Sequence, residues 1–263
     1  MCGRRTIHIV TDSEVTDTPK DEPIVLMIGT PVYGGLTPKY VLSLMETRAK
    51  LRENGILTSV QFLPGIALVS YARNELAAAF MASKCNRLLM IDADIAWTVD
   101  TVLKLVERSK TSDFVGAAPP HRRLNVDRVV QAIHDGRKNP GRFARDYAVL
   151  LTDDDRARGR TRADGDFIQV RAVGSAFLML TRRVFERIAD ASPGLKYRSI
   201  EGHDAFAYFD PFVRDGKSLG EDGAFCQRWK DVGGPIELLL RAPFIHEGPV
   251  AVAGSLHEIV YDD

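Results

Sequence analysis

The stretch RLLMIDAD, residues 87–94, decides the fold of this chain of 263 residues. Its first five residues form a short apolar run of the kind that builds a buried strand, and the run ends in two carboxylates one residue apart. Charged side chains do not stabilise an ordinary core strand, and burying unpaired carboxylates costs free energy. A divalent cation relieves that cost and can bridge to an anionic diphosphate. The alternative is that Asp92 and Asp94 merely cap a turn.

On both sides of this stretch, apolar strand-like runs alternate with amphipathic helical stretches. This alternation is typical of an α/β domain with a largely parallel sheet. The predicted strands are 23–29, 57–63, 87–91, 113–117, 167–173 and 236–241. The predicted helices are 37–54, 69–83, 99–108 and 221–230, and residues 175–189 are predicted to form an apolar turn leading into a helix.

Length and composition fit one compact domain at 23–250, because 45% hydrophobic residues can bury a sizeable core. We expect a nucleotide-binding half at 23–118 and a second half at 119–250. A polar arm at 1–22 precedes the domain and a tail at 251–263 follows it. The arginine-rich stretch 119–166 is long for a loop, so it is either functional or mobile.

The charges balance, with 35 basic and 35 acidic residues, so the overall charge does not favour a polyanionic partner. The Arg122-Arg123 pair and the run 156–162 are interpreted as solvated loop and receive no function. Three widely separated cysteines, Cys2, Cys85 and Cys226, argue against a disulfide framework and a structural zinc site. With no signal-like segment and no apolar run of roughly 18 residues, we expect a cytoplasmic protein.

Several segments, in a fixed order from 23 to 248, resemble the GT-A glycosyltransferases, particularly the family 2-like branch of bacteria, phages and large viruses. They are Gly29-Thr30-Pro31, Ala72-Arg73-Asn74, Ile91-Asp92-Ala93-Asp94, Val173-Gly174-Ser175-Ala176-Phe177, Gly220-Glu221-Asp222 with Phe225-Cys226, and His246-Glu247-Gly248. The resemblance implies a single GT-A domain, in which a Rossmann-like mixed sheet flanked by helices is joined to an acceptor-binding second half.

The resemblance also implies a nucleotide sugar as donor substrate. The matching donor-binding residues are Thr30, Pro31, Tyr33, Arg73, Asn74, Asp92 and Ala93. Tyr33 offers an aromatic face on which the base could stack, and the alternative is a plain turn with a buried tyrosine. Arg73 could reach the diphosphate, pair with Asp92, or be an ordinary surface arginine.

The metal ligands implied by the resemblance are Asp94, Asp92 and His246. Asp94 matches the direct ligand, whereas Asp92 matches the residue that binds the ribose or holds the metal through water. His246 matches a late histidine that many GT-A enzymes add as a further ligand. Imidazole suits manganese better than magnesium, so we expect Mn²⁺ before Mg²⁺.

Glu221 and Asp222 open a predicted helix, where carboxylates are also favoured by the helix dipole alone. The resemblance implies that Asp222 is the base that accepts the acceptor's proton, as an inverting transfer requires, and that Glu221 positions the acceptor. Gly174 and Ser175 match a segment beside the acceptor, where a small residue lets the backbone approach the substrate. A retaining transfer would leave these acids binding the acceptor only.

The predicted function is therefore metal-dependent transfer of a sugar from a nucleoside-diphosphate sugar to an acceptor hydroxyl. The acceptor is a saccharide, a lipid-linked glycan, a protein or, as a minority case, a modified DNA base. One alternative is a nucleotidyltransferase or pyrophosphorylase. Residues 34–39 only faintly resemble the glycine-rich signature of those enzymes. Another alternative is a non-catalytic module that binds nucleotide sugars.

Overall fold

The computed structural model describes residues 7–9, 23–152, 163–248 and 251–260. The main sheet contains β1 (Ile7–Ile9), β2 (Val25–Val32), β3 (Leu57–Pro64), β4 (Arg87–Ile91), β6 (Phe114–Ala117), β9 (Val149–Leu151), β10 (Ala163–Asp164), β11 (Phe167–Val173), β12 (Phe177–Thr181) and β17 (Ile236–Leu239). The helices are α1 (Pro38–Glu53), α2 (Val69–Ala82), α3 (Val99–Arg108), α4 (Val126–His134), α6 (Arg182–Ala191), α7 (Glu221–Asp231) and α8 (His257–Val260). Two short 3₁₀ helices are η1 (Pro140–Ala144) and η2 (Pro193–Leu195).

Smaller sheets surround the main one within the described residues. One joins β5 (Ile95–Trp97), β18 (Phe244–His246) and β19 (Val252–Gly254), and another pairs β7 (Pro120–Leu124) with β8 (Arg145–Tyr147). Two hairpins pair β13 (Lys196–Arg198) with β14 (Asp204–Phe206) and β15 (Phe212–Arg214) with β16 (Lys217–Leu219).

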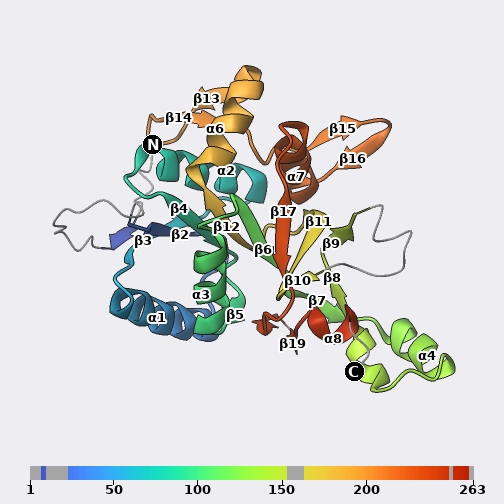
Figure 1. The fold of residues 1–263 in the computed structure, drawn as a ribbon. Coiled ribbons are helices and arrows are strands. Elements are labelled where there is room, and N and C mark those ends of the chain that lie inside the picture. The colour runs from blue at the N-terminus through green and yellow to red at the C-terminus, as the bar shows by residue number, and fades with distance from the viewer. Residues whose placement is uncertain (1–6, 10–22, 153–162, 249–250, 261–263) are drawn as a thin grey trace.

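The main sheet is mixed and has the order β1-β3-β2-β4-β12-β6-β17-β11-β10, with β9 also paired to β11. The pairs β2–β3, β2–β4 and β6–β17 are parallel, and the other pairs are antiparallel. Helices α2, α6 and α7 cover one face, and α1 and α3 cover the other (Figure 1). The predicted α/β class, with a mixed sheet flanked by helices, is confirmed. The expectation of a largely parallel sheet is wrong, because most strand pairs of the described sheet are antiparallel.

Local sequence explains where α1 begins and ends. The hydroxyl of Thr37, the N-cap residue, accepts a hydrogen bond from Tyr40 N at 3.3 Å, and Pro38 occupies the first turn, where its missing N–H costs nothing. Asn54 caps the other end, and Lys50 and Arg52 in the last turn complement the helix dipole. The helix predicted at 37–54 is confirmed.

Strand β12 corrects the prediction for residues 175–189. Phe177–Thr181 is not a turn but a fully buried strand, antiparallel to β4 on one side and to β6 on the other. A continuous apolar run lacks the alternation of a half-buried strand, so periodicity alone cannot distinguish it from the start of a buried helix. The helix begins only at Arg182. As a result, residues 174–176 lie at the same end of the sheet as Asp92.

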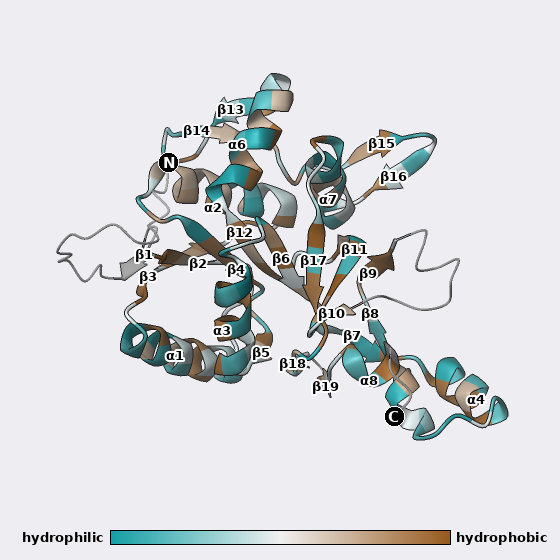
Figure 2. Ribbon diagram, viewed as in Figure 1, coloured by the Kyte–Doolittle hydropathy of each residue, from teal (hydrophilic) through white to brown (hydrophobic). Residues whose placement is uncertain are grey.

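Two hydrophobic cores lie on the two faces of this sheet. The core under α2, α6 and α7 includes Leu76, Phe80, Phe185, Phe225 and Trp229, and the core under α1 and α3 includes Tyr40, Leu44, Leu51, Val102 and Leu105. Figure 2 shows the apolar colour concentrated along the central strands. Because both faces are covered, the central strands read as continuous apolar runs rather than alternating ones.

The stretch 119–166 contains more regular structure than the sequence predicted. Its described part forms β7, α4, η1, β8, β9 and β10, while 153–162 lies outside the described residues. Helix α4 projects away from the sheet (Figure 1). At the C-terminal end, β19 pairs with β18 and Leu256 is buried, so residues 251–256 pack on the domain. None of the described helices combines the length and apolar character that crossing a membrane requires.

Candidate active site

The loop after β4 is joined by backbone hydrogen bonds to three segments that are distant in sequence. These bonds run from Asp92 N to Ala176 O (3.1 Å), from Thr37 N to Ala93 O (3.2 Å) and from Glu247 N to Asp94 O (2.8 Å). The partners belong to the turn before β12, the loop before α1 and the residue after β18. Segments that the sequence could only order along the chain therefore converge on residues 92–94.

Arg73 on α2 lies at the centre of the acidic residues. Its side chain is only 4% exposed, and its Nη2 donates to Asp92 Oδ1 at 2.9 Å. Its Nη1 donates to Glu221 Oε1 at 3.1 Å and lies 3.5 Å from Asp222 Oδ1. Burial lowers the pKa of the guanidinium, but the three carboxylates outweigh burial and raise it. Arg73 is therefore a fixed positive charge that gathers carboxylates from β4 and α7.

Asp92 and Asp94 have different environments although they are one residue apart. Burial raises the pKa of Asp92, and the neighbouring Arg73 only partly offsets that effect. Burial also acts to raise the pKa of Asp94, but the hydrogen bond to His246 and the charges of His246 and Arg122 outweigh it and hold the pKa below its usual value. Of the two, Asp94 is thus the more readily ionised carboxylate.

His246 on β18 faces Asp94, with Nε2 3.4 Å from Asp94 Oδ1. Its Nδ1 lies 2.8 Å from the carbonyl oxygen of Pro120, which can only accept, so Nδ1 carries a proton. In the neutral ring, the Nε2 lone pair faces a carboxylate oxygen, and the two acceptors repel unless a cation lies between them. A ring N–H held by a backbone carbonyl, with the other nitrogen directed at the ion, is the usual arrangement of a histidine metal ligand.

Asp94 and His246 fit a metal ion that is also bound by other ligands. Adjacent ligands of an octahedral ion lie about 3 Å apart at metal–ligand distances of about 2.1 Å. This is close to the 3.4 Å between His246 Nε2 and Asp94 Oδ1. Asp92 differs, because its Oδ1 accepts from Arg73. Within the described residues, no three His, Cys, Asp or Glu side chains form a group that could hold a metal. Water and a diphosphate would have to complete the coordination.

Asp222 lies in the first turn of α7 and contacts the segment that precedes β12. Its Oδ1 accepts a hydrogen bond from Ser175 N at 2.9 Å. A Cβ at Gly174 would lie 2.9 Å from the Ala148 Cβ and 3.7 Å from Asp222 Oδ2, so only glycine allows this approach. The sequence-predicted residues Gly174, Ser175, Glu221 and Asp222 therefore lie together. The dipole of α7 favours both acids at this position as well.

The predicted donor residues are divided between the surface and the interior. Tyr33 is 74% exposed in the loop after β2, where its ring is accessible. Thr30 is fully buried, and its hydroxyl shares a 2.5 Å hydrogen bond with the Tyr40 hydroxyl, while Pro31 lies within β2 itself. The buried amide of Asn74 donates to Asp210 and accepts from Phe209 N, both at 2.8 Å. The side chains of Thr30 and Asn74 are thus engaged in internal hydrogen bonds.

Several buried polar atoms near the site lack a hydrogen-bond partner among the described residues. They are Arg73 Nε, Ser175 Oγ and Glu247 Oε2. Buried polar atoms are nearly always paired, so water or a ligand is expected to complete the hydrogen bonding of these three atoms.

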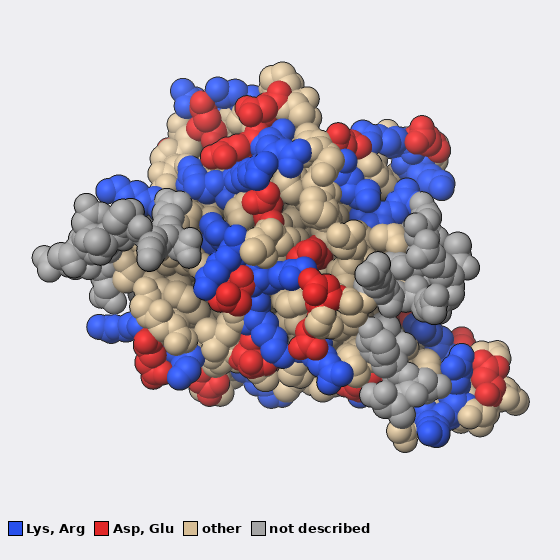
Figure 3. Space-filling view, in the orientation of Figure 1, with Lys and Arg blue, Asp and Glu red and all other residues tan. Residues whose placement is uncertain are grey.

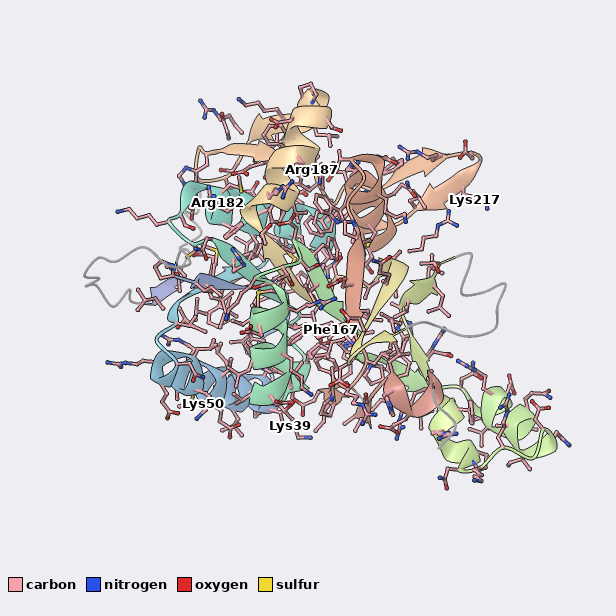
Figure 4. All side chains as sticks on the ribbon, viewed as in Figure 1. Lys39, Lys50, Phe167, Arg182, Arg187 and Lys217 are labelled. Atoms are coloured by element: carbon pink, nitrogen blue, oxygen red, sulfur yellow. The ribbon has the colours of Figure 1, made fainter. Side chains whose placement is uncertain are left out.

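Two cationic contacts of the site were not predicted from the sequence. Arg122 on β7, interpreted as solvated loop, places Nη1 2.9 Å from Asp94 Oδ2. Lys39 in the first turn of α1 lies 3.6 Å from Glu247 Oε1. Lys39 is labelled in Figure 4, and Figure 3 shows basic and acidic side chains intermixed over the visible face. Because basic and acidic residues are equal in number, 35 each, composition gave no signal that Arg122 was special.

The sequence matches no protein-family model and no curated protein. The fold is similar to A197 from STIV, at 17% identity and a TM-score of 0.47, over 89% of this chain and 91% of that one. It is similar to GalNAc-T7 in a structure with UDP, GalNAc and Mn²⁺, at 12% identity and a TM-score of 0.45. The match covers 86% of this chain and 44% of that one. It is also similar to 2-C-methyl-D-erythritol 4-phosphate cytidylyltransferase from Thermus thermophilus, at 13% identity and a TM-score of 0.37, over 83% and 88%. Likenesses at this level do not determine an activity.

Proposed function

We propose that this protein is a metal-dependent glycosyltransferase that moves a sugar from a nucleoside-diphosphate sugar to an acceptor hydroxyl. The observation that carries the proposal is the cluster around Arg73. One buried guanidinium joins Asp92, at the end of β4, to Glu221 and Asp222, at the start of α7. Donor-side and acceptor-side carboxylates are thereby held at one place, as transfer between two bound substrates requires.

Asp222 is the proposed base. Its Oδ1 is held by Ser175 N, which leaves Oδ2 to accept the proton of the acceptor hydroxyl. As the hydroxyl oxygen forms its bond to the anomeric carbon, the bond from that carbon to the diphosphate oxygen breaks and the electron pair leaves with the nucleoside diphosphate. Glu221, fixed by Arg73 at 3.1 Å, orients the acceptor. The acceptor class remains a carbohydrate or another hydroxyl compound.

Asp94 and His246 are the proposed ligands of Mn²⁺, or of Mg²⁺, and Tyr33 is the proposed platform for the base. A bound divalent ion would neutralise the charge that develops on the leaving diphosphate. The Pro120 carbonyl fixes the orientation of the His246 ring. Asp92, held by Arg73, is assigned to the ribose or to water around the ion rather than to direct coordination.

The proposal is tested first by binding. We expect one nucleoside diphosphate or its sugar, from a panel, to raise the unfolding temperature with Mn²⁺ and much less with EDTA, because only the metal links the diphosphate to Asp94. Asp94→Asn should abolish the metal-dependent part of this shift. Glu107→Gln, which alters an exposed acid on α3, is the matched control and should behave like the wild type. Absence of any metal-dependent shift across the panel would contradict the proposal.

Turnover of the stabilising donor then tests the base. We expect Asp222→Asn to lower kcat by about 10²-fold or more, the usual contribution of a general base, with little change in donor binding. An Asn Oδ1 can still accept from Ser175 N, so the fold should be retained. If Asp222→Asn retained full activity, the assignment of the base would be wrong.

Product analysis with a wider set of substrates separates the alternatives. A nucleotidyltransferase would release pyrophosphate from a nucleoside triphosphate and a sugar phosphate, and Lys39 beside Glu247 is the basic contact that gives this candidate support. A non-catalytic module would bind the nucleotide sugar and give neither transfer nor hydrolysis with any acceptor.

A further inference from the structure

Arg122 forms an ion pair with Asp94, the carboxylate on which the proposed metal site depends. Its Nη1 lies 2.9 Å from Asp94 Oδ2, while His246 Nε2 approaches the other oxygen, Oδ1, at 3.4 Å. A guanidinium therefore neutralises the same carboxylate that would bind the ion. The two cations compete for Asp94, because an arginine within hydrogen-bond distance shields a carboxylate from a second positive charge.

The contact of Arg122 differs in kind from that of Arg73. The Arg73 side chain is 4% exposed and is held by three carboxylates, so moving it would leave buried charges unpaired. The Arg122 side chain is 53% exposed, and Asp94 is the partner of its guanidinium in the structure. Ion pairs of that exposure contribute little net stability, so the Arg122 guanidinium can leave Asp94 at small cost if it finds another anion.

We propose that Arg122 is a displaceable counterion that neutralises Asp94 in the ligand-free protein and transfers to the donor diphosphate when the metal binds Asp94. The inference rests on the proposed function and adds a regulatory property to that site. Without a nucleotide, the metal must displace Arg122 and leave it without an anion. With a nucleotide present, the displaced guanidinium gains the diphosphate as a partner. Metal and nucleotide therefore bind interdependently, and each strengthens the other.

The test compares Arg122→Gln with the neighbouring Arg123→Gln, which removes the same charge from the same exposed strand. Arg123 acts on Asp146 rather than on Asp94, so it is a matched control. The probes are Mn²⁺ alone, followed by the electron paramagnetic resonance of the unbound ion, and the nucleoside diphosphate that most stabilises the wild type. Thermal unfolding of each ligand-free variant checks that it is folded.

In Arg122→Gln we expect Mn²⁺ alone to bind about threefold to fivefold more tightly than in the wild type, which is the range of a half-exposed ion pair. At saturating Mn²⁺, the nucleoside diphosphate should bind more weakly by a similar factor. The coupling between the two ligands should fall by that same factor, because without metal Arg122 stays on Asp94 and nucleotide binding is unchanged. Arg122→Ala should repeat both changes, and Arg123→Gln should show neither.

If Arg122→Gln binds Mn²⁺ no more tightly than the wild type does, Arg122 is not a competing counterion and the inference is overturned. That result is distinguishable from failure of the proposed function, in which the wild type itself binds neither Mn²⁺ nor any nucleoside diphosphate. The second outcome overturns both.

Discussion

Gly234 lies against the face of Trp229, the largest fully buried side chain of the described residues. A Cβ at position 234 would lie 1.9 Å from the indole Cε2, and the indole is fixed by a 2.7 Å hydrogen bond to Pro235 O and by Arg187 over its ring. Moving the indole away from a Cβ at position 234 would disturb these contacts.

We therefore expect Gly234→Ala to lower the free energy of unfolding by about 2 kcal/mol, as overpacking of a filled core does. Chemical denaturation measures the change. The control is Gly194→Ala, because a Cβ at position 194 meets nothing within 4 Å. Equal stabilities of the two variants would contradict the packing described here.

Sequence alone offered the pairing of Arg73 with Asp92 as one alternative, and the structure contains that pair. It did not predict that Arg73 also contacts Glu221 and Asp222. The loop at 92–94 was found because two carboxylates after an apolar strand need a partner. Arg73 joins Asp92 to both acids of α7. Its contact with Glu221 spans 148 positions of the chain, and a local sequence pattern cannot predict a contact at that separation. Asn74, adjacent in the same motif, faces Phe209 and Asp210 instead. Neighbours on a helix face different partners, so a motif match does not transfer to each of its residues.

At the level of elements, Arg182 links α2 to α6. Its guanidinium donates to the carbonyls of Phe80, Met81, Ser83 and Cys85 at 2.7 to 3.2 Å (Figure 4 labels Arg182). The last carbonyls of a helix have no partner within it, and a cation at this end also complements the helix dipole. Arg182 thus closes the C-terminal end of α2, the helix that carries Arg73.

Replacing Arg182 with Ala should cost about 2 kcal/mol of stability, since charged hydrogen bonds to buried carbonyls are lost. Arg183→Ala is the control, because Arg183 is more exposed and its ion pair with Asp113 is long, 3.8 Å. The two midpoints of thermal unfolding should differ by several degrees. Indistinguishable midpoints would show that Arg182 does not stabilise α2.

Elements with a clear hydrophobic periodicity or a capping residue could be predicted from the sequence, and the others could not. The strand at 87–91 and the helix at 99–108 have the bounds expected from sequence, because each has an apolar pattern and a clear end. Strand β12 was missed, since burial on both faces removes its period. Strands β5 and β18 have only three residues each, too few for a pattern, although β18 carries His246.

At the level of the whole molecule, β12 joins the two predicted halves into one sheet. Strand β6 belongs to the half at 23–118, yet both of its neighbours, β12 and β17, come from the half at 119–250. We expect a fragment of residues 1–124 to lack a cooperative unfolding transition, because β6 has nothing to pair with and β4 exposes an apolar edge. Circular dichroism during heating measures this. A sharp transition like that of the full chain would show that the first half is an independent domain.

The position of β12 between β4 and β6 also affects how the chain folds during its synthesis. During synthesis the chain delivers β4 and β6 first, and β12 leaves the ribosome only after the whole of 119–176 has been translated. At typical elongation rates the apolar edge of β4 stays unpaired for roughly several seconds. Residues 88–91, beside the loop at 92–94, are therefore the segment most exposed to wrong pairing with another nascent chain, and slow codons between 119 and 176 would lengthen that interval.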